Sequence, residues 1–594
     1  MNTRITKKLL AVLTAGMMIL MMASLAFAAH AAGYDVTDAT RFVFTNDSVT
    51  ATDGAYTGYK IKGTALTINE AGTYVVSGSC ENGSIVIKKN VTGVTLVLEN
   101  LTLSASATAP ITCNKGSGVT IVAAAGSVNN LSDDKYNNDD VYTDETLYPD
   151  IENAVIKCKD GSNVTIAGTG TINVTAYGKN GVKGGADLYE EDEDGNATDV
   201  LLSTASLTIR DVTLNVEISH SYKDPEDPSA YDGDAIKSEK ELNILSGTVT
   251  VSANDDGIKC DYVLNIGEEG TDGPTIKVTK AAEGIEGAVV NVFSGSVYVT
   301  ATDDGINAAN GDIAERSADF SYNQYGGYVW VNVTNGDGVD SNGSASLTGG
   351  TLEVYAPSQG DGDPIDTEFG CTFGGATVLA VGHAMMQQSY AGTYVAFGGS
   401  AGRGGFGGTG TNLVTAGGAI TVADANGSVL YSGSAVRDAS YVLFASPSLT
   451  AGGTYTLNGS SSATAGTSNG NQGGFPGGQG GDQPGFPGEG GDQPGFPGGQ
   501  GGDQPGFPGE GGDRPGFPGG APGEFLLGDI DGDGAVTAAD ARIALRISVG
   551  LEIVEVFSPS YMAADVDRSG LITAADARLI LRAAVGLETL QPTR

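Results

Sequence analysis

The segment Asp256-Gly257-Ile258 is one copy of a three-residue motif that recurs along much of the chain. Each copy has an acidic residue first, a small residue or proline second and an aliphatic residue third. The aliphatic positions are separated by 22, 27, 21, 33 and 26 residues in the series Asp234-Ala235-Ile236, Asp256-Gly257-Ile258, Glu283-Gly284-Ile285, Asp304-Gly305-Ile306, Asp337-Gly338-Val339 and Asp363-Pro364-Ile365. A period in the twenties is typical of a solenoid, in which each repeat packs against the next.

Short segments of alternating apolar and polar residues lie between the copies of the motif. Alternation directs the aliphatic side chains to one face of a strand and the intervening side chains to the other. The expected outer positions are Thr250, Lys277, Tyr298, Trp330 and Glu353. We therefore predict a mostly β protein in which residues 33–459 form a right-handed parallel β-helix. A β-propeller is the alternative, although its blades need roughly 40–50 residues each.

The chain is strongly acidic. Its 594 residues include 31 Lys and Arg against 71 Asp and Glu, so the formal net charge is −40. This charge argues against nucleic acid and anionic lipid as partners, because both need a basic face. It favours hard cations such as Ca²⁺, which carboxylates bind through oxygen. With only three histidines, a multi-histidine zinc site is not expected.

The amino terminus has the pattern of a secretory signal peptide. Arg4, Lys7 and Lys8 precede an apolar run over residues 9–22, and small-x-small cleavage sites follow. We expect residues 1–32 to be removed and the mature protein to be secreted and extracellular; a retained membrane anchor is the alternative. The five cysteines are an odd number, which favours buried free thiols over a disulfide framework.

Residues 460–523 differ in composition from the rest of the chain. Gly-Phe-Pro-Gly recurs there, with its aromatic residue at Phe475, Phe486, Phe496, Phe507 and Phe517. A segment of Gly, Pro, Gln and Asp cannot bury enough apolar surface to offset its ordering entropy. We predict a disordered linker between two folded parts of the chain.

Stacked repeats would place the acids of the motif in one column, at a strand spacing of about 4.8 Å. Like charges at that distance repel and raise one another's pKa. Bound Ca²⁺ would relieve the repulsion, because it takes its ligands from carboxylate and carbonyl oxygens. The alternatives are side chains splayed into water and counter-ions from Lys237 and Lys259. The candidate Ca²⁺ ligands in this part of the chain are Asp234, Asp256, Glu283, Asp303, Asp304, Asp337, Asp340, Asp363 and Asp366.

Several further motifs occur in order along residues 34–459. They include Gly72-Thr73-Tyr74-Val75-Val76-Ser77-Gly78, Asn129-Asn130-Leu131-Ser132-Asp133, Gly168-Thr169-Gly170 and Asn426-Gly427-Ser428-Val429-Leu430-Tyr431. Together with the acid-Gly-Ile series, they resemble the secreted carbohydrate-binding β-helix family of plant-cell-wall-degrading bacteria. The resemblance implies a fold like that of pectate lyases, bound Ca²⁺ and association with cellulose or acidic pectic polysaccharide.

Two kinds of polysaccharide ligand remain open. An anionic polyuronate would need bridging Ca²⁺, because this part of the chain is itself acidic. A neutral glucan would need an aromatic platform on the surface. Tyr328 and Trp330 share one face of a strand and are the candidate sugar-binding residues, although a covered surface patch is an equally good interpretation.

The carboxyl-terminal part contains a duplicated twelve-residue loop with oxygen ligands at the spacing that binds Ca²⁺. The copies start 36 residues apart, and 15 of 24 aligned positions are identical. Each loop is followed by a predicted helix, and the pattern is similar to that of a type I dockerin over residues 524–594. The Ca²⁺ ligand positions are Asp529, Asp531, Asp533, Ala535 and Asp540 in the first loop and Asp565, Asp567, Ser569, Leu571 and Asp576 in the second.

A dockerin implies a cohesin module on a cellulosome scaffold protein as its partner. The near-symmetry of the two copies predicts docking through either helix. The frequent Ser-Thr pair of the family is Ala-Ala in both copies, which leaves the type of cohesin open. The positions that correspond to the family's recognition residues are Ala538, Ala539, Leu545 and Arg546 in the first copy and Ala574, Ala575, Leu581 and Arg582 in the second.

The leading hypothesis is a non-catalytic, Ca²⁺-dependent polysaccharide-binding protein attached to a cellulosome. One alternative is a polysaccharide lyase that uses Ca²⁺ to acidify the uronate α-proton and a Lys or Arg as the base. Lys237, Lys259, Arg210 and Arg316 are the candidate bases. A second alternative is a structural surface adhesin without sugar specificity.

Overall fold

The computed structural model of the protein describes residues 34–52, 54–144, 146–186, 189–191, 197–220, 233–310, 316–360, 362–384, 388–398, 412–468, 527–531, 535–548, 559–564, 566, 572 and 574–585. It divides into two compact units, residues 1–474 and residues 475–594, and each is described by itself. The expected signal peptide and most of the expected linker lie outside the described residues. None of the described helices has the length and apolarity needed to cross a membrane.

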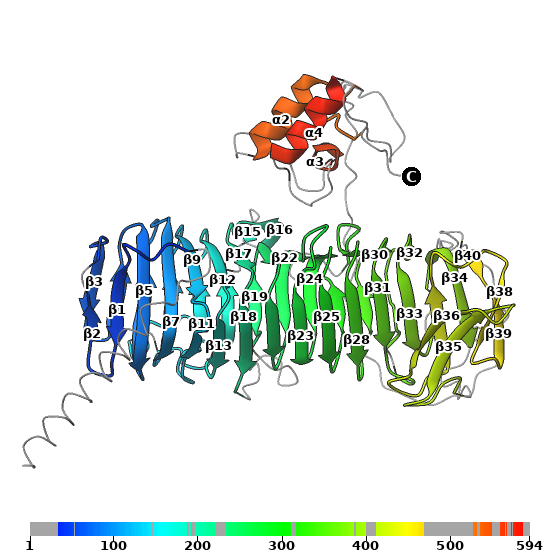
Figure 1. The fold of residues 1–594 in the computed structure, drawn as a ribbon, viewed down its shortest axis with the longest axis horizontal. Coiled ribbons are helices and arrows are strands. Elements are labelled where there is room, and N and C mark those ends of the chain that lie inside the picture. The colour runs from blue at the N-terminus through cyan, green and yellow to red at the C-terminus, as the bar shows by residue number, and fades with distance from the viewer. Residues whose placement is uncertain are drawn as a thin grey trace, which may run out of the picture. The chain divides into compact units, whose positions relative to one another are not determined.

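One 34-stranded sheet dominates the first unit, and most of its strand pairs are parallel (Figure 1). Strands of successive repeats pair with one another and form three ladders that run along the stack. The motif ladder contains β4 (Ala65–Ile68), β6 (Ser84–Ile87), β8 (Ile111–Cys113), β11 (Ala154–Cys158), β14 (Asn180–Gly184), β19 (Ile236–Ser238), the first parts of β22 (Ile258–Ile266) and β24 (Ile285–Val292), β26 (Ile306–Ala308) and β29 (Val339–Ser341).

The other two ladders complete each repeat. The second ladder contains β1 (Thr40–Phe44), the first parts of β5 (Gly72–Cys80) and β7 (Val94–Ser104), β9 (Gly118–Ala123), β12 (Asn163–Gly168), β17 (Ser206–Ile209), β20 (Glu241–Ile244), the second parts of β22 and β24, β27 (Ser321–Gln324), β30 (Ser344–Leu347), β32 (Cys371–Phe373) and β34 (Tyr390–Gly398). The third ladder contains the second part of β7, β10 (Val128–Ser132), β13 (Thr171–Ala176), β18 (Thr213–Ile218), β21 (Thr248–Ser252), β23 (Thr275–Lys280), β25 (Ser296–Ala301), β28 (Tyr328–Val333), β31 (Thr351–Tyr355) and β33 (Thr377–Gly382).

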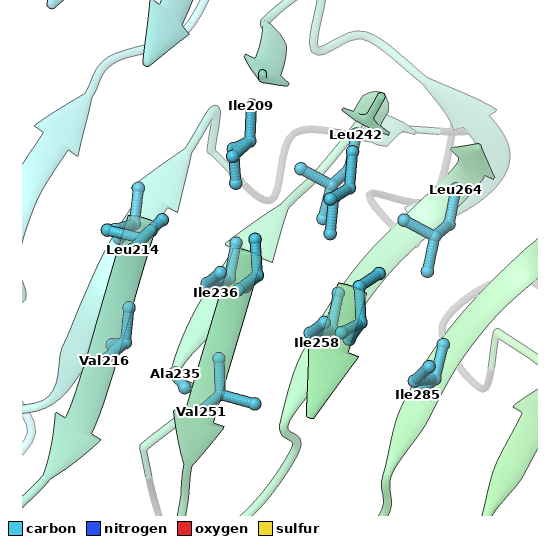
Figure 2. Packing of buried hydrophobic residues seen from close by; sticks show 14 of the residues in the cluster. Ile209, Leu214, Val216, Ala235, Ile236, Leu242, Val251, Ile258, Leu264 and Ile285 are labelled. Atoms are coloured by element: carbon cyan, nitrogen blue, oxygen red, sulfur yellow. The ribbon is translucent and has the colours of Figure 1, made fainter. Parts of the chain in front are cut away.

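The aliphatic residues of the motif lie in register in the motif ladder. Ile236 pairs with Ile258, and Ile258 pairs with Ile285. All three side chains are fully buried, and Figure 2 shows them in neighbouring strands, with Val251 and Leu264 in the same interior. Full burial of such a side chain stabilises the fold by roughly 1.5–3 kcal/mol. This register confirms the expected mostly β fold with a large parallel sheet.

The predicted outer positions of the third ladder also form a column. Thr250 is in register with Lys277, Lys277 with Tyr298, Tyr298 with Trp330, and Trp330 with Glu353. Each of these residues is half-buried or exposed, whereas the aliphatic residues on either side are buried. The alternation in the sequence therefore predicts the inner and outer faces correctly.

Close packing explains why the second residue of the motif is small. A Cβ atom added to Gly305 would lie 2.1 Å from Cγ1 of Val331, and one added to Gly338 would lie 1.9 Å from Cγ1 of Val354. Both valines belong to the third ladder, which packs against the motif ladder inside the stack. Neither glycine has a positive φ, so space and not backbone conformation excludes a larger residue.

Antiparallel strands close both ends of the stack. At the first end, β2 (Val49–Ala51) pairs with β1 and β3 (Tyr59–Lys62) pairs with β4. At the other end, β37 (Tyr441–Ala445) pairs with β33 and β34, and β40 (Gly466–Ser468) pairs with β34. A separate hairpin consists of β15 (Tyr189–Glu191) and β16 (Ala197–Leu201).

A four-stranded antiparallel sheet covers part of the outer surface near the second end. It contains β35 (Ala419–Asp424), β36 (Val429–Ser434), β38 (Thr454–Leu457) and β39 (Ser461–Thr464). Its Ile420 and Leu457 form a second hydrophobic cluster with Tyr355 and Phe397 of the stack. The described strands thus continue past the expected domain boundary at residue 459, because β38 takes β39 as its hairpin partner.

The second unit contains the helices α2 (Ala538–Ser548), α3 (Pro559–Ala564) and α4 (Ala574–Ala584). α2 and α4 contact each other and bury Ala544 and Ile580 in a small core. Both helices begin where the sequence predicts a helix after each loop, whereas the short α3 is not predicted. The expected ligands Asp533, Asp565, Asp567, Ser569 and Leu571 lie outside the described residues.

Candidate functional site

The acidic residues of the motif stack from one repeat to the next. The N–H of Gly284 donates to the carbonyl oxygen of Asp304 at 2.8 Å, and the N–H of Gly305 donates to that of Asp337 at 2.9 Å. The side chains add to this ladder, because Oδ1 of Asp304 accepts the N–H of Asp337 at 2.7 Å. We call these residues the acid column: Asp234, Asp256, Glu283, Asp304, Asp337 and Asp363.

A second column lies three residues after the first in each repeat. Its members are in register on the motif ladder, and we call them the flanking column: Lys157, Lys183, Lys237, Lys259, Glu286, Asn307 and Asp340. The column is basic over four consecutive repeats and then becomes acidic or neutral. The repeated motif in the sequence covers only part of this column, because the repeats of Lys157 and Lys183 have Ala154 and Asn180 in place of the motif acid.

Buried carboxylates pair with three lysines of the flanking column, Lys183, Lys237 and Lys259, whereas burial, followed by repulsion from Lys183, lowers the pKa of Lys157 to about 8. Nζ of Lys259 lies 2.9 Å from Oδ2 of Asp256 and 2.8 Å from Oε2 of Glu286. Burial alone would lower the pKa of Lys259, but the neighbouring carboxylates raise it well above its ordinary value. Lys259 therefore stays protonated, which a general base cannot do.

The neighbouring lysines pair with carboxylates outside the motif. Nζ of Lys183 lies 3.4 Å from Oε1 of Glu239, and Nζ of Lys237 lies 3.9 Å from Oδ1 of Asp261. Glu239 and Asp261 are 0% and 4% exposed, so they are buried counter-ions. Neither carboxylate belongs to the repeated motif, so the sequence gives no signal for them.

The acidic residues Asp304, Asp337 and Asp340 differ from Asp256 and Glu286, which contact Lys259. Within the described part of the chain, Asp304, Asp337 and Asp340 form no salt bridge. Burial, followed by repulsion from neighbouring carboxylates, raises the pKa of Asp337 to about 8, although the N–H of Asp363 lowers it. Burial and the same kind of repulsion raise the pKa of Asp340 to about 7 and that of Asp304 to about 6.

Two groups of carboxylates come close enough to share a cation. Ligand oxygens of Asp234, Asp255 and Asp256 lie within 4.8 Å of one another, as do those of Asp256, Glu283 and Glu286. The ammonium group of Lys259 already contacts the second group. The first group fits Ca²⁺ better, because Lys259 contacts one of its carboxylates, that of Asp256, but two of the second group's, those of Asp256 and Glu286. In the described residues, no such group includes the expected ligands Asp303, Asp304, Asp337, Asp340, Asp363 and Asp366.

The first loop of the second unit brings three expected ligands together. Oxygens of Asp529, Asp531 and Asp540 lie within 4.8 Å of one another. Asp540 lies in the first turn of α2 and accepts the N–H of Thr537 at 2.8 Å. Burial would raise the pKa of Asp540, but hydrogen bonds from Thr537 and from backbone N–H groups lower it. The equivalent Asp576 of α4 is also fully buried, while Ala535 is exposed.

The expected cohesin-binding positions include two similar exposed pairs. Leu545 and Leu581 are 47% and 46% exposed, which is unusual for leucine in a small helical core. Arg546 and Arg582 follow them and are also exposed. Ala538 is exposed and Ala539 half-buried; the side chains of Ala574 and Ala575 lie outside the described residues.

Trp330 and Tyr328 point outward, but other groups partly cover them. Trp330 packs against the second hydrophobic cluster, with its ring 6.0 Å from that of Tyr355. The ring of Tyr328 lies 5.8 Å from that of Tyr298. This packing favours a structural role for Trp330, because the four-stranded sheet occupies part of the surface that a sugar would need.

Three comparisons with known proteins bear on these observations. Residues 62–217 match a protein-family model described as "Carbohydrate-binding domain-containing protein". A protein of Acetivibrio thermocellus with the same description is 27% identical over 262 residues, covering 38% of this chain and 84% of that protein. A solved structure described as "polysaccharide lyase-like protein from C. thermocellum, Gadolinium derivative" is 20% identical with a TM-score of 0.30, covering 57% of this chain and 96% of that one. The chain is thus similar to carbohydrate-binding domain proteins over part of its length.

Proposed function

We propose that the stacked parallel sheet within residues 33–459 is a right-handed β-helix, and that this domain binds plant cell-wall polysaccharide without cleaving it. The observation that carries the proposal is the match of residues 62–217 to the carbohydrate-binding family model. The matched region forms successive repeats of the stacked parallel sheet, which offers long surfaces for a polymer. The ion pairs of Lys259 argue against this candidate base of the alternative lyase, because a lysine that is held protonated cannot abstract a proton.

We propose further that Ca²⁺ stabilises this binding unit. Asp234, Asp255 and Asp256 are the residues that would hold the ion, since their oxygens already lie within 4.8 Å of one another. Ca²⁺ would supply positive charge to a buried acidic cluster. Burial, followed by repulsion from Glu286 and Asp234, raises the pKa of Asp256 well above its ordinary value although Lys259 lowers it, which supports a need for such charge.

For the second unit, we propose a type I dockerin that attaches the secreted protein to a cohesin module. The convergence of Asp529, Asp531 and Asp540 at the start of α2 supports Ca²⁺ binding by the first loop. The matching exposed pairs, Leu545 with Arg546 and Leu581 with Arg582, support docking through either helix.

Affinity electrophoresis of the full chain tests the binding function. The native protein would run through gels that contain a soluble polysaccharide, either polygalacturonate or a neutral glucan, with Ca²⁺ present. We expect retardation by at least one polysaccharide and no unsaturated uronate product after long incubation. Product formation would establish the lyase instead, and unchanged mobility in every gel would favour the structural adhesin.

A further inference from the structure

The segment between β10 and β11 is a long loop over residues 133–153. Its described residues contain no strand or helix, whereas most connections in compact domains have about 4–6 residues. Long loops without secondary structure of their own are usually functional when they are ordered.

Buried amide and carboxylate groups fix the base of the loop. Asn137 is fully buried; its Nδ2 donates to Asp133 at 2.9 Å, and its Oδ1 accepts the N–H of Glu152 at 2.8 Å. Asn138 is 1% exposed and donates to the carbonyl oxygen of Gly178 in the next repeat. These bonds tie both ends of the loop to the stack, so the loop is pre-organised.

Three tyrosines of the loop form a compact cluster. The rings of Tyr136 and Tyr148 are nearly parallel, with centroids 5.5 Å apart and planes at 13°. The ring of Tyr142 meets both edge-on, at 4.9 Å from Tyr136 and 5.2 Å from Tyr148. We call these three residues the tyrosine cluster. Nζ of Lys135 lies over the ring of Tyr136, 5.0 Å from its centroid.

The tyrosine cluster is not an extension of the hydrophobic core. Its rings are half-buried, and none of them is among the residues that pack against the four hydrophobic clusters of the described chain. Val141 and Leu147, on the same loop, are 39% and 68% exposed. Half-buried aromatic rings that a rigid base holds away from a core offer an apolar surface to a ligand.

The charged side chains around the tyrosine cluster favour a neutral polysaccharide over an anionic one. Asp139, Asp144 and Asp150 on the same loop are exposed, and Asp140 pairs with Lys179. Exposed carboxylates accept hydrogen bonds from hydroxyl groups but repel anionic polymers. The surface thus suits a neutral sugar chain, whose C–H faces stack on aromatic rings and whose hydroxyl groups donate to carboxylates.

We propose that the tyrosine cluster is the binding platform for a neutral polysaccharide. The inference rests on the proposed polysaccharide-binding function and names the surface and the class of ligand. The platform lies within residues 62–217, the region that matches the carbohydrate-binding model, whereas Tyr328 and Trp330 lie outside it. Trp330, in contrast, packs against the second hydrophobic cluster, to which none of the three tyrosines of the described loop belongs.

Binding isotherms of the full chain on insoluble cellulose and insoluble mannan test this proposal, with polygalacturonate as the anionic probe. The double variant Tyr142→Ala/Tyr148→Ala should bind the neutral polymer at least tenfold more weakly, because it removes one ring of the stacked pair and the edge-on ring. Tyr148→Phe keeps the ring and should bind as the unmodified chain does. Tyr298→Ala, which removes an exposed tyrosine of the third ladder, is the matched control.

Hydroxyl-radical footprinting provides a second measurement that needs no variant. A soluble neutral oligosaccharide should protect the peptide that contains the tyrosine cluster from oxidation. Equal binding by the double variant, or loss of binding with Tyr298→Ala alone, would overturn the platform while leaving the proposed function intact. Binding of polygalacturonate alone would overturn the ligand class, and binding of no polysaccharide would overturn both proposals.

Discussion

At the scale of single residues, the motif glycines are fixed by close packing between ladders. Replacing Gly338 by Ala would place a methyl group 1.9 Å from Cγ1 of Val354. We expect Gly338→Ala to lower the free energy of unfolding by roughly 1–3 kcal/mol, the usual cost of overpacking a core. Urea denaturation measures this, with Gly466→Ala as the control, because no atom lies within 4 Å of its added Cβ. Equal stability of both variants would contradict the steric explanation.

Lys259 provides a test of the buried charges. Lys259→Met removes the ammonium group shared by Asp256 and Glu286. Because this leaves two buried carboxylates without a counter-ion, we expect a loss of roughly 3–5 kcal/mol in the absence of Ca²⁺. Thermal denaturation in EDTA measures the loss, and Lys277→Met, at an exposed position of β23, is the control. A variant as stable as the control would show that the ion pairs contribute little.

The sequence predicts part of this site and cannot predict the rest. The repeat period of the motif and the alternation of apolar and polar residues are local properties of the sequence. They correctly predict which residues line the inside of the stack and which lie outside. The partial burial of Trp330 depends instead on a hydrophobic cluster whose members include Ile420 and Leu457, which lie far from it in the sequence. The tyrosine cluster is missed because its residues are spread irregularly over a loop, without a period that would mark them.

At the scale of elements, the acid column makes stability depend on pH. Burial raises the pKa of Glu283 and of Asp337 to about 8 in the folded chain. The folded state therefore holds protons that the unfolded state has already lost between about pH 4 and pH 8, so folding is favoured as the pH falls through that window. In EDTA, we expect the thermal midpoint of the stack to rise as the pH is lowered from 8 to 5.

Ca²⁺ should weaken this dependence, because the ion favours the ionised carboxylates. Thermal scans at pH 5 and pH 8, each with Ca²⁺ and with EDTA at constant ionic strength, separate the two effects. Ca²⁺ should raise the midpoint more at pH 8 than at pH 5. A midpoint in EDTA that rises with pH, or one that Ca²⁺ leaves unchanged at pH 8, would contradict the account of the acid column.

At the scale of the whole molecule, the second unit should dock through either of two equivalent faces. The double substitution Leu545→Ala/Arg546→Ala in the full chain should change cohesin affinity less than threefold, because α4 offers the equivalent pair. Adding Leu581→Ala/Arg582→Ala should abolish docking. Calorimetric titration with a type I cohesin measures both effects. Complete loss of binding with the first pair alone would show that α2 is the sole contact.

The central claim is that the stacked β unit holds cell-wall polysaccharide without cleaving it. The most direct measurement is a depletion isotherm of the full chain on washed plant cell-wall particles, in Ca²⁺ and in EDTA, with the soluble sugar released into the supernatant measured in the same tubes. We predict saturable binding in Ca²⁺, weaker binding in EDTA and no released sugar above the protein-free control. Absence of binding in Ca²⁺, or release of sugar that grows with time, would contradict the claim.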